Sequence, residues 1–180
     1  GEGRGRSKKQ AEQAAARHAW ETLRKISGLF VPELPEVETV RRDLDPALRG
    51  RTIVDVSVRR DRAVRRQPHA EFIAQLRGQR IDGVRRHGKF LIADLDDAVM
   101  VGHLRMSGQL RMAAPADSQA KHTHVVIDLD DGSQLRFVDP RTFGELFVDT
   151  VGSDGRPTSM RHLGPDALAR ITDPAFPERL

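Results

Sequence analysis

The residues that could carry chemistry in this sequence stand together in the stretch PELPEVE, which begins at Pro32. Inside a chain the proline nitrogen is an amide, whose delocalised lone pair can neither accept a proton nor attack carbon. As a first residue, Pro32 would carry a secondary amine, and a free α-amine has a pKa of roughly 7.7–8.0. Such an amine can attack an electrophilic carbon and form an iminium, and Glu33 could then move protons. The alternative interpretation is that PELPE only begins a helix.

Metal and thiol chemistry find little support in the sequence. The chain has no cysteine, which excludes disulfides, thiol catalysis and a Cys-built zinc site within these residues. In KHTH, His122 and His124 would lie on one face of a regular strand, but no third ligand has a useful spacing. We therefore predict no metal site, and a phosphate contact or an ordinary surface position for His122.

Positive charge is concentrated in two segments. Residues 1–30 hold seven Lys and Arg against three Glu, whereas the other 150 residues carry 23 charges of each sign. Within them, residues 49–89 hold twelve Lys and Arg against four acids. This pattern indicates a surface that faces a polyanion, although a solvated Arg-rich face would have the same composition. No apolar run could span a membrane and no signal peptide is visible, so we expect a soluble cytoplasmic protein without membrane contact.

The elements that must position these residues follow from the spacing of the apolar side chains. A helix is predicted over residues 34–44, with Pro35 in its first turn and DPALRG as its end. TIVDVSVRR alternates as a strand in which Ile53 opposes Val54, Val56 and Val58, and residues 69–78 form a short helix closed by Gly78. Seven further strands are predicted in QRIDGVRRHG, KFLIADLD, AVMVGHLR, GQLRMA, HTHVVIDLD, SQLRFVD and GELFVD.

Many short strands with polar turns predict an α+β, mainly β fold: an antiparallel β-sandwich flanked by helices. LDDG, residues 129–132, is typical of a tight hairpin turn. Residues 1–25 read as a Gly-rich loop and an extra N-terminal helix whose alanine stripe has no evident packing partner. We predict three segments: residues 1–30 with a linker, residues 31–165 as the main domain, and residues 166–180 as the start of a linker.

Several motifs occur in a fixed order: VPELPEVETVRRDL, RRHGKFLI, GHLRMSGQLR, KHTHVVIDLDDGSQLRF, DPRTFGEL and HLGPDAL. Together they closely resemble the N-terminal domain of bacterial formamidopyrimidine-DNA glycosylase, also called Fpg or MutM, over about residues 31 to 170. The resemblance implies base-excision repair by a bifunctional glycosylase and AP lyase. Such enzymes remove 8-oxoguanine and formamidopyrimidines and then nick the strand by β,δ-elimination. It also implies a bacterial, nucleoid-associated monomer whose partner is double-stranded DNA with oxidised bases or abasic sites.

The resemblance assigns roles to individual residues. Pro32 is implied to attack the sugar C1′, Glu33 to donate a proton at the sugar, and Glu36 to shape the pocket. Lys89 is implied to hold the DNA phosphate beside the lesion. The remaining DNA contacts that the resemblance implies are His103 and Arg105 on the backbone, and the three side chains that fill the gap left by the flipped base: Met106, Arg141 and Phe143. A DNA contact at His122 is predicted from the sequence itself. MSG and RTFG place Met106 and Phe143 beside glycines, which favours exposed turns over core positions.

The first residues carry a second resemblance. GEGRGRSKKQAEQAAARHAW is similar to the end of the double-stranded RNA-binding domain of bacterial ribonuclease III, in which a lysine pair, here Lys8 and Lys9, contacts RNA phosphates. Because the rest of such a domain is missing, binding of double-stranded RNA is not expected. The chain therefore resembles an in-frame junction. Val31 stands where the glycosylase family has its initiator methionine, and GTG codes for valine and also starts translation, so Val31 is a candidate start.

The resemblance also defines what this chain lacks. The family continues with a helix–two-turn–helix and a four-Cys zinc finger, so its zinc site lies in a region absent here and we expect no cofactor in this chain. Since affinity scales with neutralised phosphates, we predict weak, mostly non-specific DNA binding by these residues alone. With Pro32 acylated, the iminium route would be closed. Two alternatives stay open: an endonuclease VIII-like glycosylase for oxidised pyrimidines, and a non-catalytic nucleic-acid-binding protein.

Overall fold

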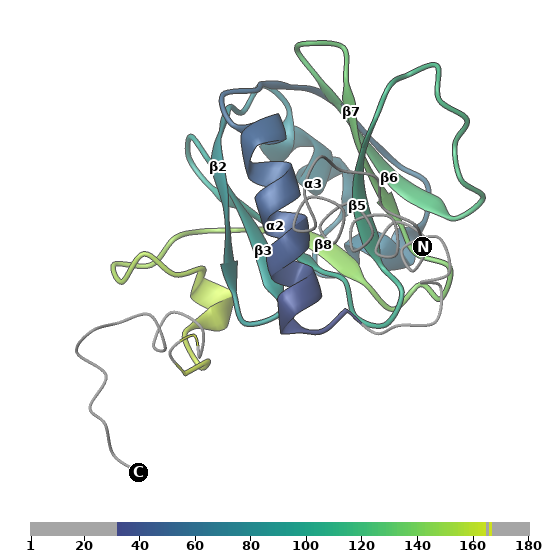
Figure 1. Cartoon of the computed structure of the whole chain (residues 1–180). Helices are drawn as coiled ribbons and strands as arrows, with labels where there is room; N and C mark the ends of the chain where they lie inside the picture. Colours follow the sequence, from purple (N-terminus) through teal and green to yellow (C-terminus); the bar gives the residue numbers. More distant parts are fainter. Residues whose placement is uncertain (1–31, 165, 167–180) are drawn as a thin grey trace, which may run out of the picture. The chain divides into compact units, whose positions relative to one another are not determined.

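The computed structural model describes residues 32–164 and 166, all within one unit that begins at Pro32. They form two four-stranded antiparallel sheets that face each other, with a helix along each open side (Figure 1). This confirms the predicted α+β class and the sandwich flanked by helices. The predicted N-terminal helix, with Lys8 and Lys9, lies outside the described residues.

The first sheet has the strand order β1–β6–β7–β5 and the second has the order β2–β3–β4–β8. The strands are β1 (Ile53–Val58), β2 (Ile81–His87), β3 (Phe90–Leu95), β4 (Val99–His103), β5 (Gln109–Ala113), β6 (Thr123–Leu129), β7 (Gln134–Val138) and β8 (Glu145–Asp149). All seven strands predicted after the first are therefore confirmed. The predicted hairpin joins β6 to β7, where Gly132 adopts a φ of 81° that favours glycine.

Helix α2 (Leu34–Leu48) closes the side of the sandwich between β2 and β5. Pro35 suits its first turn, because a proline there removes only an N–H that would have no helical partner. The predicted end at residue 44 was wrong, since the helix continues through Pro46 to Leu48. Leu48 extends the buried stripe of Leu44 by one turn, and this burial outweighs the one hydrogen bond that Pro46 removes.

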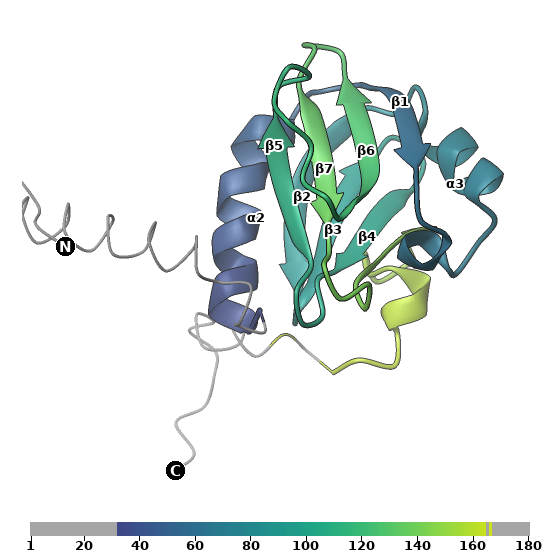
Figure 2. The same cartoon turned by 90° about the vertical axis from the view of Figure 1, so that its right-hand side faces the viewer.

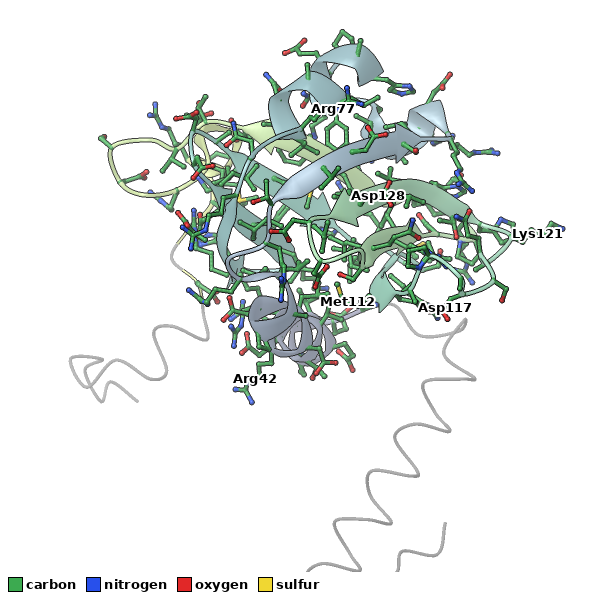
Figure 3. All side chains as sticks on the ribbon, turned by 90° about the horizontal axis from the view of Figure 1, so that it is seen from above. Arg42, Arg77, Met112, Asp117, Lys121 and Asp128 are labelled. Atoms are coloured by element: carbon green, nitrogen blue, oxygen red, sulfur yellow. The ribbon has the colours of Figure 1, made fainter. Side chains whose placement is uncertain are left out.

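The opposite side is closed by the 3₁₀ turn η2 (Asp61–Val64) and helix α3 (His69–Leu76), which pack on β1 and β8 (Figure 2). Phe72 and Leu76 bury the inner face of α3. Seen from above, Arg42 points outward from α2, and Arg77 lies on the opposite side of the two sheets, where it pairs with Asp55 of β1 (Figure 3). The predicted helix over residues 69–78 is confirmed, with Gly78 following its end at a φ of 84°.

The face pattern predicted for β1 was wrong. Ile53 and Val56 are both buried, whereas Val54 is 54% exposed. The pairing of β1 with β6 shifts register between Ile53 and Asp55, and this irregularity inserts one residue that points outward. Simple alternation from Ile53 therefore placed Val54 correctly on the opposite face but assigned Val56 to the wrong one.

The core lies between the two sheets, and β3 shows how it is built. Leu91, Ala93 and Leu95 face the main core, while Ile92 points to the other face of the sheet. There it packs in a smaller apolar cluster that Met160 covers, from the 3₁₀ turn η3 (Thr158–Met160). In the part of the chain that the structure describes, no helix combines the length and apolar character needed to cross a membrane.

Candidate active site

Strand register places the predicted site residues of the second sheet at one end of the sandwich. His103, the last residue of β4, pairs with Phe90 at the start of β3 and with Glu145 at the start of β8. The turn between β2 and β3, the end of β4 and the start of β8 therefore lie side by side.

The first sheet contributes to the same end. Val138, the last residue of β7, pairs with Gln109 at the start of β5 and with Thr123 at the start of β6. Two short connections, residues 104–108 and 139–144, link β4 to β5 and β7 to β8 there. We call this end of the sandwich the site end.

The start of α2 reaches the site end through an ion pair between Glu33 and Lys89. Lys89 lies in the turn between β2 and β3, where Gly88 adopts a φ of 56° that side-chain-bearing residues rarely adopt. Pro32 is half-buried and directly precedes Glu33. The fold thus brings a carboxylate and an ammonium group, both partly exposed, next to residue 32.

The turn that carries Lys89 is anchored by Arg86. Its side chain is 7% exposed, donates to the Gly88 carbonyl at 2.9 Å, and forms ion pairs with Glu38 of α2 and with Asp166. The hydrogen bond from Arg41 lowers the pKa of Glu38 to about 2, and Arg86 adds to this against the opposing effect of burial. Arg86 therefore ties the helix that follows Pro32 to the turn that presents Lys89.

His103 is neutral at the pH of a cell. Burial lowers its pKa to about 4, and the positive charge of Arg105 acts in the same direction. Its Nδ1 lies 3.0 Å from the Arg105 backbone N–H and so accepts that hydrogen bond, which leaves the proton on Nε2. The ring of Phe90 packs edge-on against the imidazole at a centroid distance of 4.5 Å. His103 is therefore a neutral imidazole held in one orientation, and its Nε2–H can donate a hydrogen bond.

Two large apolar side chains point into solvent at the site end. Met106 is 40% exposed and Phe143 is 44% exposed, which agrees with the prediction that both occupy turns. The backbone beside each is in the left-handed region, with a φ of 53° at Arg105 and 58° at Thr142. Non-glycine residues seldom adopt this conformation, and such outliers gather where a site needs a particular loop shape.

Asp139, a residue that the sequence did not single out, holds these two connections together. Its fully buried carboxylate accepts the Gly144 N–H at 2.7 Å, the Arg141 N–H at 3.2 Å and the hydroxyl of Ser107, next to Met106. Its backbone N–H donates to the His122 carbonyl at 3.0 Å. The Asp-Pro pair that opens DPRTFG is a turn signal, but only the fold shows that one carboxylate binds both connections.

The two histidines of KHTH lie near each other, with their ring centroids 6.4 Å apart. His124 is buried, and its Nε2 lies 2.7 Å from the Asp139 carbonyl. His122 directly precedes β6 and is half-buried. Among residues 32–164 and 166, no group of three or more His, Asp or Glu side chains could hold a metal ion.

Glu36 carries an unusual polar atom. Its Oε2 is buried and has no hydrogen-bond partner in the described part of the chain. A buried carboxylate oxygen without a protein partner costs free energy, so Glu36 Oε2 is a candidate to accept a hydrogen bond from a bound molecule or from water. Glu36 lies one turn after Pro32, in the first turn of α2.

Comparison with known proteins agrees with this arrangement. Residues 31–146 match the family model of the formamidopyrimidine-DNA glycosylase N-terminal domain. Formamidopyrimidine-DNA glycosylase of Symbiobacterium thermophilum is 42% identical over 151 residues, which are 83% of this chain and 50% of that protein. The Bacillus licheniformis protein of the same name is 44% identical over 140 residues, 77% of this chain and 51% of its own length. The chain thus spans about half the length of these relatives.

Solved structures show the same fold. The Lactococcus lactis formamidopyrimidine-DNA glycosylase bound non-covalently to DNA with an AP site has a TM-score of 0.63 and 34% identity, over 66% of this chain and 45% of that one. The same enzyme with N7-benzyl-Fapy-dG DNA gives 0.63 and 36% identity, over 66% and 44%. From Val31 to Leu146, this chain therefore belongs to the formamidopyrimidine-DNA glycosylase N-terminal domain family.

Proposed function

We propose that this chain supplies the catalytic half of a base-excision repair enzyme, a DNA glycosylase and AP lyase that removes oxidised purines from double-stranded DNA. The observation that carries the proposal is the meeting of Pro32, Glu33 and Lys89 at the same end of the sandwich as the exposed side chains of Met106 and Phe143. Relatives that are named formamidopyrimidine-DNA glycosylases support it.

Access to a damaged base requires the exposed apolar side chains at the site end. A base inside a duplex cannot be reached by a nucleophile, so it must leave the stack at a cost of a few kcal/mol. Exposed apolar side chains such as Met106 and Phe143 can enter the vacated step, and Arg141 can hydrogen-bond the unpaired partner base. Lys89 and the neutral His103 would then donate to backbone phosphates on either side of the flipped nucleotide.

The chemistry requires the nitrogen of Pro32 to be a free amine. The lone pair of this nitrogen would attack C1′ of the sugar. The glycosidic bond then breaks, and its bonding electron pair leaves with the protonated base. Opening of the sugar ring then gives an iminium between Pro32 and C1′, and Glu33 would donate the proton at the sugar. Removal of the C2′ proton expels the 3′-phosphate, and a second elimination expels the 5′-phosphate. In the sequence as written, Val31 acylates this nitrogen.

A specific observation favours a second candidate substrate. One solved neighbour, again the Lactococcus lactis enzyme, is bound to DNA that contains an oxidised pyrimidine. That structure has the same TM-score of 0.63 and 36% identity. Oxidised pyrimidines therefore belong in any test of lesion preference, next to 8-oxoguanine and formamidopyrimidine.

Borohydride trapping tests the proposal. The 180-residue chain and a chain that begins at Pro32 are incubated with duplex DNA that carries an abasic site, and reduction converts any iminium into a stable adduct. We expect an adduct with the shorter chain alone, since only its Pro32 is an amine. Acetylation of its first residue should abolish the adduct. Equal adducts from both chains would show a different nucleophile, and no adduct from either would show that this half lacks the chemistry.

A further inference from the structure

A buried acid at the site end gathers three arginines that the proposed mechanism does not use as a group. Glu145, the first residue of β8, has a side chain that is 2% exposed. Arg66 donates to both of its oxygens, at 2.9 and 3.0 Å, and Arg65 and Arg105 donate at 3.2 and 3.3 Å. The two neighbouring arginines follow η2, and the third precedes Met106, so one carboxylate joins two separate segments. We call these four residues the Glu145 cluster.

The Glu145 cluster carries an excess of positive charge. Burial alone would raise the pKa of Glu145, but the hydrogen bond and charge of Arg66, with the charge of Arg65, lower it to about 2. The carboxylate is therefore ionised at neutral pH, and three guanidinium groups surround one negative charge. A buried acid needs only one such partner for charge balance. The two extra cations repel each other, and an external anion would relieve that repulsion.

The guanidinium groups are held in place and still reach solvent. Arg66 stacks on the ring of Phe147 at 3.9 Å, and Nη2 of Arg65 donates to the Phe143 carbonyl at 3.2 Å. Their side chains are nevertheless 37% and 35% exposed. The bonds to Glu145 and Phe143 use Nε and Nη2, and leave Nη1 of both arginines without an acceptor in the described part of the chain. A fixed guanidinium with free donors loses little side-chain entropy when it binds phosphate.

The position of the cluster identifies the anion. Arg65 contacts the loop that carries Phe143, and the guanidinium of Arg62 lies 6.0 Å from the Phe143 ring. A side chain that enters a base step brings the flanking phosphates close to its own loop, since successive phosphates of one strand are spaced by only a few ångströms along the helix axis. The cations around Glu145 therefore lie beside the loop that those phosphates would approach.

We propose that Glu145 holds Arg65 and Arg66 as a phosphate-binding surface that contacts the DNA backbone beside the step entered by Phe143. This inference rests on the proposed function and extends it, because it adds two contacts and the acid that orients them. Glu145 acts as a positioning residue, and the arginines supply the contacts. The competing interpretation is that the ion pairs only tie the turn after η2 to β8.

Salt dependence of DNA binding separates the two interpretations. The 180-residue chain and its variants are titrated with duplex DNA that carries a tetrahydrofuran abasic-site analogue, at several salt concentrations. Each lost phosphate contact should reduce the slope of log affinity against log salt by about 0.9. We expect that reduction for R65Q and for R66Q. R65K keeps the positive charge and should keep most of the slope.

Arg51 provides a matched control. Its side chain is 42% exposed and its Nε lies 3.2 Å from Asp131, but it pairs with the hairpin at the opposite end of β7. R51Q should leave the slope unchanged. The melting temperature of each variant is measured in parallel, because loss of a purely structural ion pair lowers stability without changing the slope.

The outcomes are distinct. Slopes that stay at the wild-type value in R65Q and R66Q, with or without a lower melting temperature, would overturn the proposed phosphate surface and leave the proposed function intact. Slopes that fall equally in R51Q would also overturn it, because the effect would then be general charge. If the wild-type chain does not bind the abasic duplex at all, both this inference and the proposed function fail.

Discussion

Replacing Asp139 by asparagine tests whether one carboxylate sets the shape of the site end. Asparagine has the same size, so no cavity forms, but one carboxylate oxygen becomes an NH₂ group. If the remaining oxygen keeps Ser107 and the Arg141 N–H, the new amide faces the buried Gly144 N–H, with which Asp139 now makes a 2.7 Å hydrogen bond. If the amide turns over to keep Gly144, its NH₂ group faces the Arg141 N–H instead. Two donors would face each other in a buried position.

The magnitude follows from that geometry. A hydrogen bond to a charged acceptor contributes about 1.5–3 kcal/mol, and a buried donor left without a partner costs about 1–3 kcal/mol. The lost hydrogen bond and the unpaired donor describe partly the same effect, so the two values are not added in full. We expect Asp139→Asn to lower the free energy of unfolding by about 3 kcal/mol. For a domain of this size that corresponds to a fall in melting temperature of roughly 10 °C.

Thermal unfolding, followed by circular dichroism, measures the stability, and affinity for an abasic duplex measures the effect on the loops. Asp149→Asn is the matched control. Asp149 accepts the Ser159 N–H at 2.9 Å and the hydroxyl of Thr158, but at the far end of β8. We expect both variants to melt earlier and only Asp139→Asn to bind the duplex less tightly. A fall of less than about 2 °C for Asp139→Asn, equivalent to under roughly 1 kcal/mol, would refute the hydrogen-bond reasoning. Equal affinities in the two variants would refute the positioning role.

Two further substitutions have defined outcomes. His103 takes up a proton near pH 6.5 when unfolded and only near pH 4 when folded, so stability falls as the pH falls from 6.5, by about 2 kcal/mol at pH 5. His103→Gln should therefore reduce the change in melting temperature between pH 7 and 5. Glu38 and Glu145, with pKa values of about 2, affect stability mainly below pH 5. A profile in the variant that matches the wild type would contradict the low pKa of His103. In Gly144→Ala the new Cβ would lie 2.7 Å from the Phe137 ring, so we expect a loss of about 1–3 kcal/mol in chemical denaturation, and full stability would contradict the close approach.

Sequence pattern predicted the strands well because a residue's face in a regular strand depends on neighbours two positions away. Leu91 and Ile92 show this, since they take opposite faces of β3 as alternation requires. The same rule failed for Ile53 and Val56, where an inserted residue shifts the register, and nothing local in IVDVSV marks the insertion. The end of α2 failed for a related reason. Proline is a strong local signal, but burial of Leu48 is a tertiary effect.

The site was predicted in part because some of its signals are local. Exposed tips at Met106 and Phe143 follow from the glycines beside them, and the structure confirms both. The roles of Asp139 and Glu145 could not be predicted in this way. Each bonds to residues of other segments, Glu145 to Arg65 across 80 positions of sequence, and one sequence does not reveal which segments will meet.

The two buried acids also explain how the site end keeps exposed, strained loops in one shape. Asp139 and Glu145 are both buried, and both lie at this end rather than in the apolar core between the sheets. Exposing Met106 and Phe143 forgoes apolar burial, and positive φ values beside them add backbone strain. Charged hydrogen bonds offset these costs without covering the two side chains that we propose enter DNA. A site stabilised by apolar packing could not leave the same residues exposed, so the placement of the two acids agrees with the role proposed for these loops.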